Sequence, residues 1–288
     1  MARLHTRKLQ CISPAGLHHM AYKEWGEADN PDVLICVHGL TRVSDDFDAL
    51  AEQMSAQYRV ICPDIVGRGR SDWLRDPKYY EVPQYVSDMV SLIARLDVDR
   101  VSWLGTSLGG LVGLVLASLP ATPICRLVLN DIGPVLDPLA LARIGEYVGQ
   151  PARFADFDEA VQYIRQTSAS FGPHSDAQWH KLATDVLRQD AQGQWSLHYD
   201  PGLAVPFKAT TEQAAQAAQQ MLWAAYDAIA CPTLLIRGAE SDLLSRETAQ
   251  AMTARGPKAR LVELPGVGHA PTLVSQEQIA VVKEFLQQ

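Results

Sequence analysis

The sequence VSWLGTSLGGLVGLVLASL, residues 101–119, predicts a strand, a tight turn and a helix in immediate succession. Its first part is a short apolar run, and the segment after the turn has apolar residues at helical spacing. Residues 105–109 (GTSLG) match the pattern G-x-S-x-G, in which a serine occupies a strained strand-to-helix turn. Side chains two positions before and after that serine would collide with neighbouring strands, so Gly105 and Gly109 suit the turn. We therefore expect Ser107 to be a nucleophile at a helix N-terminus, where free N–H groups favour an oxyanion.

Short apolar runs before and after this stretch predict a mostly parallel, twisted sheet. Runs that are apolar at every position suit strands covered by helices on both faces. The predicted strands are 33–37, 58–62, 101–105, 126–130, 233–237 and 260–264, and the predicted helices are 85–96, 107–119, 245–255 and about 275–287. Residues 4–12 and 17–25, separated by Ser-Pro-Ala-Gly, predict an antiparallel hairpin. The fold class is therefore α/β, with about eight strands flanked by helices.

One long segment interrupts the alternation of strands and helices. From Pro134 to Trp223 the sequence has polar helical stretches and scattered aromatic residues but no buried strand. We interpret it as an all-helical cap inserted after the sixth strand, over the sheet edge where open α/β sheets bind ligands. The predicted division is a core of residues 1–133 and 224–288 and a cap of residues 134–223.

The charge balance argues against partners with a phosphate surface. Lys and Arg number 25 and Asp and Glu number 33, which gives a net charge of −8 at pH 7. Nucleic acids and anionic membranes attract the opposite sign. We expect neither a nucleic-acid partner nor a membrane partner.

The cysteines and the N-terminus indicate a reducing compartment. Most of the cysteines lie in or beside apolar runs, where free thiols pack as small hydrophobic groups, and none has Cys-x-x-Cys spacing. They are Cys11, Cys36, Cys62, Cys125 and Cys231. The charged start of the chain is not followed by the apolar region of a secretory signal. These features predict a cytoplasmic protein.

Several motifs in a fixed order resemble those of the α/β-hydrolase superfamily, over nearly the whole chain. Residues 38–40 (HGL) follow the first buried strand, as the family's His-Gly oxyanion segment does. Residues 63–72 (PDIVGRGRSD) look like its P-D-x-x-G-x-G-x-S-[DN] loop, and Ser107 falls at its nucleophile elbow. The resemblance implies a serine carboxylesterase-like branch with a helical cap.

A serine hydroxyl needs a base and an orienting acid to act as a nucleophile. The family order of serine, acid and histidine implies that His269, on a glycine-rich loop after the last strand, is the base. His38 is a rival, although a histidine at that place is usually a structural hydrogen bonder in the family. The resemblance favours Asp242, after strand 233–237, as the acid. Asp131, directly after strand 126–130, is the alternative.

The resemblance also implies an oxyanion hole and suggests where substrate contacts lie. The hole should be formed by the backbone N–H groups of Leu40 and Leu108. We expect Arg42, Trp195 and Phe171 to contact substrate, although Arg42 paired with a nearby acid and aromatic residues packed in the cap core are the simpler alternatives.

No cofactor or metal is expected from the sequence. Gly67 and Gly69 form a G-x-G pair, but Asp72 stands where a dinucleotide motif needs a third glycine, and the histidines lack metal-ligand spacing.

The leading functional hypothesis is a carboxylesterase that cleaves small to medium acyl esters through an acyl-enzyme intermediate. A lactonase, a hydroxyalkanoate-oligomer hydrolase or a C–C bond hydrolase could use the same triad. A non-catalytic small-molecule receptor is a further alternative, because the fold alone does not dictate function. The expected partner is a small-molecule ester, and a homo-oligomer is left open.

Overall fold

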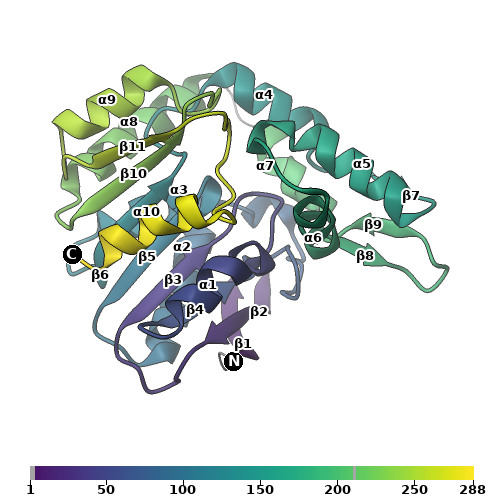
Figure 1. Ribbon diagram of the computed structural model, residues 1–288, viewed down its shortest axis with the longest axis horizontal. Coiled ribbons are helices and arrows are strands. Elements are labelled where there is room, and N and C mark those ends of the chain that lie inside the picture. The colour runs from purple at the N-terminus through teal and green to yellow at the C-terminus, as the bar shows by residue number, and fades with distance from the viewer. Residues whose placement is uncertain (1–3, 210–211) are drawn as a thin grey trace.

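The computed structural model describes residues 4–209 and 212–288, and its centre is an eight-stranded sheet (Figure 1). The strands lie in the order β1-β2-β4-β3-β5-β6-β10-β11. Their bounds are β1 Leu4–Ser13, β2 Gly16–Trp25, β3 Val33–Val37, β4 Arg59–Pro63, β5 Val101–Thr106, β6 Ile124–Asn130, β10 Thr233–Gly238 and β11 Arg260–Leu264. β1 and β2 pair antiparallel, as do β2 and β4, and the pairs from β4 to β11 are parallel. The predicted sheet is confirmed.

Helices cover both faces of this sheet, which explains why β3, in the middle of the strand order, is apolar at every position. Alternate residues of β3 point to opposite faces. Leu34 packs in one cluster with α1 (Asp48–Met54) and α10 (Gln276–Leu286), which lie together across the strands in Figure 1. Ile35 packs in the cluster that includes α2 (Val82–Leu96), α3 (Leu108–Ala117) and α9 (Arg246–Ala254). Each central strand is therefore part of two hydrophobic cores.

The helix ends follow the capping residues of the sequence. Ser245 and Ser275 each accept a hydrogen bond from the backbone N–H three residues later, so they cap α9 and α10. α2 ends at Asp97, which has the left-handed conformation typical of a residue that closes a helix. These bounds lie within about three residues of the predicted ones.

The insertion between β6 and β10 is mainly helical, but the expectation of an all-helical cap was wrong. Its helices are α4 Pro138–Tyr147, α5 Phe157–Thr167, α6 Asp176–Val186, α7 Ala204–Ala209 and α8 Glu212–Ala228. A small antiparallel sheet, in the order β7-β9-β8, accompanies them. Its strands are β7 Arg153–Phe154, β8 Leu187–Gln189 and β9 Trp195–Leu197. Strands of two or three residues are too short to show an alternating pattern in the sequence.

The shorter helical turns and the extent of α8 complete the element order. The 3-10 helices are η1 Ser44–Phe47, η2 Pro77–Tyr79, η3 Ala169–Phe171 and η4 Pro201–Leu203. α8 continues past Trp223 and contacts α3 of the core. The division of the chain at residues 134 and 223 stays a prediction.

The glycine-rich loop at 63–72 joins the insertion to the sheet. The N–H of Gly69 donates to the carbonyl of His198, and the N–H of Asp200 donates to that of Gly67, at 3.1 and 2.8 Å. The hydroxyl of Tyr80 donates to the Asp200 carboxylate at 2.6 Å. The loop is therefore a fixed connection between the two parts of the fold.

Within the described residues, no helix has both the length and the apolar character needed to cross a membrane. The five cysteines are free thiols. Cys36 and Cys62 are buried, as their apolar runs predicted, whereas Cys125 and Cys231 are only partly buried and Cys11, outside those runs, is buried.

Candidate functional site

Ser107 occupies the sharp turn between β5 and α3 that the sequence predicted. It is the residue before the first turn of α3, and its φ of 51° lies in the left-handed region that non-glycine residues rarely adopt. A Cβ on Gly105 would overlap the backbone of Gly109, and a Cβ on Gly109 would overlap the carbonyl of Val37. The two glycines thus allow β5, α3 and β3 to approach closely enough to hold the serine in this strained conformation.

This close packing gives a stability prediction. We expect Gly109→Ala to lower the free energy of unfolding by about 3 kcal/mol or more, since the new methyl group meets rigid backbone rather than a movable side chain. Gly145→Ala is the matched control. Gly145 lies within α4, and a methyl group added there would have no neighbour within 4 Å, so the alanine should be neutral or stabilise by about 0.5–1 kcal/mol. Urea unfolding of both variants measures the contrast, and equal effects would contradict it.

His269 is the residue that the structure brings to Ser107. Its Nε2 lies 2.9 Å from the Ser107 Oγ, and its side chain is largely buried. The loop that carries it follows β11 and is held from the insertion, because the hydroxyl of Ser170 donates to the His269 carbonyl. The N–H of Gly268 also donates to the Ser170 carbonyl, at 2.7 Å. The histidine is therefore positioned by both parts of the fold.

The acid next to His269 is Asp131, and the expectation of Asp242 was wrong. The Nδ1 of His269 lies 2.8 Å from Oδ2 of Asp131, whose side chain is completely buried. The same carboxylate accepts hydrogen bonds from the Ser241 hydroxyl at 2.6 Å and from the Gly238 N–H at 2.8 Å. Three hydrogen-bond donors thus surround the Asp131 carboxylate and fix its direction toward His269.

Asp242 follows two of those donors, Gly238 at the end of β10 and Ser241 in the loop after it, but points elsewhere. Its side chain is 47% exposed, and its Oδ2 pairs with Arg143 of α4 at 3.0 Å from Nε and 2.7 Å from Nη2. The loop after β10 therefore supplies the groups that hold Asp131 rather than the acid itself. The sequence signal for Asp131 was its place directly after β6, which is the neighbour of β10 in the sheet.

The two residues expected to supply oxyanion donors lie on either side of Ser107. Leu108 is the first residue of α3, and Leu40 belongs to the loop after β3. This loop passes close to the serine, since a Cβ on Gly39 would lie 3.7 Å from the Ser107 Cβ. Their role as an oxyanion hole stays a prediction.

The sequence did not identify Arg68 as part of this arrangement. Its buried guanidinium donates from Nε to the Leu40 carbonyl at 2.8 Å and from Nη1 to the Val66 carbonyl at 2.7 Å. It also lies over the ring of Tyr85, with the Arg68 Cζ 5.0 Å from the ring centre. Arg68 is therefore a positioning residue for the segment that contains Leu40. Its place in the motif at 63–72 was the one available signal.

His38 has a structural position. Its Nε2 accepts the backbone N–H of Ile65 at 2.9 Å, and its Nδ1 lies 2.7 Å from the Gly39 carbonyl. Complete burial lowers the pKa of His38 to about 4, against the smaller opposing effect of the Asp64 carboxylate. The neutral imidazole thus joins the loops after β3 and β4.

The lowered pKa of His38 predicts a pH dependence of stability. The histidine protonates near pH 6.5 in the unfolded chain but only near pH 4 in the folded protein. Between these two pH values the unfolded chain therefore binds more protons than the folded protein does. Stability is therefore full above about pH 6.5 and falls by roughly 3 kcal/mol as the pH drops to about 4. NMR titration of the imidazole tests this directly, and a midpoint near the ordinary histidine pKa would contradict it.

A cavity of about 110 Å³ opens onto Ser107 and His269 between the sheet and the insertion. Phe171 lines it, as expected from the sequence. Arg42 lines it too, but its guanidinium is paired with Asp46. Trp195 belongs instead to the hydrophobic core of the insertion, where its ring packs edge-on against Phe157 at 5.0 Å. Of the three expected substrate contacts, Phe171 therefore lies at the cavity, Arg42 lies there but is engaged in an ion pair, and Trp195 is outside the cavity lining.

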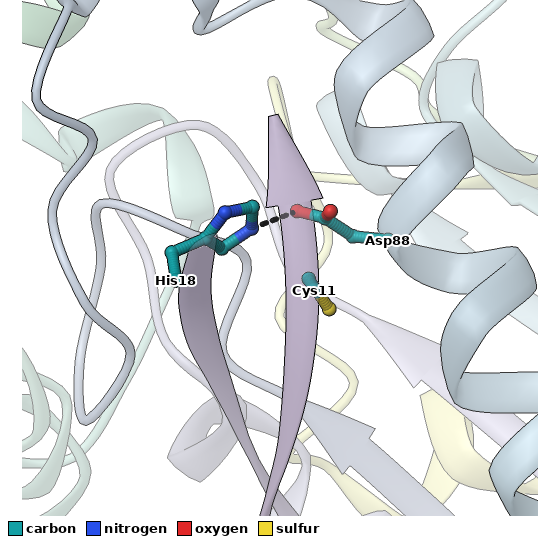
Figure 2. Close-up of side chains that lie close together, drawn as sticks. All are labelled: Cys11, His18 and Asp88. Atoms are coloured by element: carbon teal, nitrogen blue, oxygen red, sulfur yellow. Dashed lines mark hydrogen bonds and ion pairs between the residues drawn. The ribbon is translucent and has the colours of Figure 1, made fainter. Parts of the chain in front are cut away.

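A second cluster of polar side chains lies away from this cavity, between the hairpin and α2. Figure 2 shows Cys11 and His18 on neighbouring strands and Asp88 reaching them from the helix. The thiol sulfur, one imidazole nitrogen and one carboxylate oxygen of these residues lie within 4.8 Å of one another. The Nε2 of His18 lies 3.0 Å from one Asp88 oxygen, and Gln84 donates to the other at 2.8 Å. Burial, followed by the charge of Asp88, raises the pKa of Cys11 to about 12. These contacts describe a hydrogen-bonded bridge that fastens the hairpin to the helix.

Comparisons with known proteins agree with this architecture. The family model described as "Alpha/beta hydrolase family" matches residues 34–282. The chain is 55% identical over 280 residues to a 3-hydroxybutyrate-oligomer hydrolase of Cupriavidus necator, with 96% of each chain covered. It is 25% identical to Esterase YbfF of Escherichia coli, over 83% of this chain and 87% of that one. A crystal structure of an alpha/beta hydrolase from Novosphingobium aromaticivorans is 36% identical, covers 100% of this chain and 99% of its own, and has a TM-score of 0.87. The strand order of the sheet, the turn at Ser107 and these matches together show that the chain belongs to the alpha/beta hydrolase family.

Proposed function

We propose that this protein hydrolyses the ester bonds of short 3-hydroxybutyrate oligomers through an acyl-enzyme intermediate on Ser107. The observation that carries the proposal is the continuous hydrogen-bonded chain from Asp131 through His269 to Ser107, which ends at the cavity. This is the arrangement that activates a serine hydroxyl. The full-length similarity to the hydrolase of C. necator supports the substrate class.

In the first half of the reaction, the Ser107 Oγ attacks the ester carbonyl carbon while His269 Nε2 takes the hydroxyl proton. The carbonyl oxygen becomes an oxyanion, and the backbone N–H groups of Leu40 and Leu108 donate to it. Asp131 holds the imidazole in position through Nδ1 and stabilises its positive charge. The tetrahedral intermediate then expels the alkoxide side of the ester, and His269 gives it the proton, so a free hydroxyl end leaves.

In the second half, one water molecule replaces the departed alcohol. His269 removes a proton from the water, whose oxygen attacks the acyl carbon bonded to Ser107. Collapse of the second tetrahedral intermediate breaks the bond to Oγ and returns the proton to the serine. In total, one water and one ester bond give one hydroxyl group and one carboxylic acid, which ionises at neutral pH.

Hydrolysis of hydroxybutyrate oligomers replaces general carboxylesterase activity as the leading hypothesis. The two differ in substrate and not in mechanism, and the relative with 55% identity favours the former. Partly and fully buried apolar side chains, including Ile144, Tyr147, Tyr163 and Phe171, line the cavity beside Ser107. They provide apolar contacts for a methyl-bearing four-carbon unit.

The experiment is direct assay of the purified protein with 3-hydroxybutyrate dimer and trimer. We expect the protein to release monomer from both oligomers, which liquid chromatography with mass spectrometry would measure. The kcat/KM for the oligomers should be higher than that for p-nitrophenyl butyrate. If the protein hydrolysed p-nitrophenyl butyrate but neither oligomer, a general carboxylesterase would be the better hypothesis. Tight binding of oligomer with no turnover of any ester would indicate the receptor alternative.

A further inference from the structure

The cavity beside Ser107 has a charged side chain on its wall as well as the apolar ones. One face of α4 contributes three lining residues, Arg143, Ile144 and Tyr147, with the spacing expected for a single helical face. Arg143 and Arg42 are the arginines that line the cavity in the described part of the chain. A positively charged side chain on the cavity wall could bind a hydroxy-acid oligomer, because such an oligomer carries a carboxylate at one end.

Arg42 is already committed to other contacts. Its Nε and Nη2 donate to the two carboxylate oxygens of Asp46 at 2.8 and 2.5 Å, and Nη2 also donates to the Leu182 carbonyl at 3.2 Å. The side chain is 10% exposed. Breaking a buried, bidentate pair of this kind leaves an uncompensated charge, so Arg42 serves the connection between core and insertion rather than a ligand.

Arg143 is held much more loosely. Its side chain is 40% exposed, and its hydrogen bond from Nε and its ion-pair contact from Nη2 both end on a single oxygen of Asp242. An ion pair this exposed contributes only about 0–1 kcal/mol, so replacing or sharing the Asp242 carboxylate has a small cost. The pair also shows that a carboxylate can reach the guanidinium at this place in the fold.

We propose that Arg143 binds the free terminal carboxylate of the hydroxy-acid oligomer and so selects anionic substrates. The inference rests on the proposed function and adds the end of the substrate that is recognised. The protein has a net charge of −8, which repels anions unless a local positive group opposes it. The planar guanidinium offers two parallel N–H donors to a carboxylate. Among the described lining residues only Arg42 shares this geometry, and it is already paired with Asp46.

This placement assigns the two sides of the scissile ester. In a dimer the carboxylate belongs to the alcohol half, which leaves first when Ser107 takes the acyl group. Arg143 therefore holds the leaving hydroxy acid, while the acyl unit occupies the part of the cavity next to Ser107. Arg143 does not touch the reacting atoms and is a substrate-binding residue, so its loss should act on KM more than on kcat.

The test compares 3-hydroxybutyrate dimer with its methyl ester, in which the terminal carboxylate is uncharged. Cleavage of the internal ester is followed by mass spectrometry for wild type, Arg143→Gln, Arg143→Lys and Arg153→Gln. For Arg143→Gln we expect kcat/KM for the free acid to fall at least about tenfold, mainly through KM, because a hydrogen bond to a charged group is lost. Its kcat/KM for the methyl ester should stay within about twofold, and Arg143→Lys should retain part of the preference for the free acid.

Arg153→Gln is the matched control. Arg153 is an exposed arginine on β7 of the same insertion, where it donates a hydrogen bond to Gln194, and it is outside the cavity lining. Its replacement should therefore leave kcat/KM unchanged for both the free acid and the methyl ester. Equal losses on both substrates for Arg143→Gln, or no loss on either, would overturn the role of Arg143 while leaving the proposed function standing. Wild type that cleaves neither form of the dimer would instead refute the proposed function, and this inference with it.

Discussion

Replacing Asp131 with asparagine should lower kcat by about ten-thousandfold. The amide cannot stabilise the imidazolium, and by donating to Nδ1 of His269 it would favour the tautomer that leaves Nε2 unable to take the serine proton. The rate of p-nitrophenyl butyrate hydrolysis measures the effect. Circular dichroism and thermal unfolding establish that the variant is folded, which matters because Asp131 accepts three hydrogen bonds in a buried position.

Asp242→Asn is the informative comparison, since the sequence motif alone favours that residue as the acid. The Asp242 carboxylate is half exposed and pairs with Arg143, so its loss should change kcat for the uncharged p-nitrophenyl butyrate by less than about threefold. A large loss at Asp242 together with a small loss at Asp131 would reverse the assignment made from the structure.

Ser107→Ala should remove nearly all activity, with a loss in kcat of roughly 10⁵–10⁶-fold. The variant keeps His269, Asp131 and the backbone donors, but it lacks the atom that forms the acyl bond. The alanine must adopt the same left-handed backbone conformation as the serine, so a modest decrease in stability is also expected.

The covalent intermediate provides a second measurement for the same residue. Wild type quenched during turnover of the 3-hydroxybutyrate dimer should gain the mass of one hydroxybutyryl group, located by peptide mapping to the segment with Ser107, and Ser107→Ala should gain none. Ester hydrolysis that survives in the alanine variant, or an acyl group mapped to another residue, would exclude Ser107 as the nucleophile.

The strands of the central sheet could be predicted almost to the residue, for a simple physical reason. A parallel strand covered on both faces must be apolar throughout, and such runs stand out in the sequence. The prediction 33–37 matches β3, which is buried throughout, at both ends. The prediction 260–264 also matches β11 at both ends, although this edge strand carries Arg260 and Glu263 and is only partly buried. The two- and three-residue strands of the insertion were missed, because their pairing depends on contacts between segments distant in the chain.

The acid shows where sequence reasoning stops. Asp131 and the loop of Asp242 follow β6 and β10, which are neighbours in the sheet, so both aspartates emerge at the same edge and in the family order. Chain order cannot choose between them. The choice depends on side-chain direction, and in the structure Ser241 and Gly238 turn inward to hold Asp131 while Asp242 turns outward to Arg143.

The sequence by itself determined the α/β fold, and it predicted the elbow at Ser107 and the choice of His269, because each depends on residue types at close spacing: apolar runs, flanking glycines and a histidine on a terminal loop. Only the tertiary structure decided which aspartate lies beside His269, the commitment of Arg42 to Asp46 and the availability of Arg143 at the cavity. Those outcomes depend on which of several charged side chains meet in space. Contacts between charged groups are set by directions and distances of a few ångströms, which a linear pattern does not record.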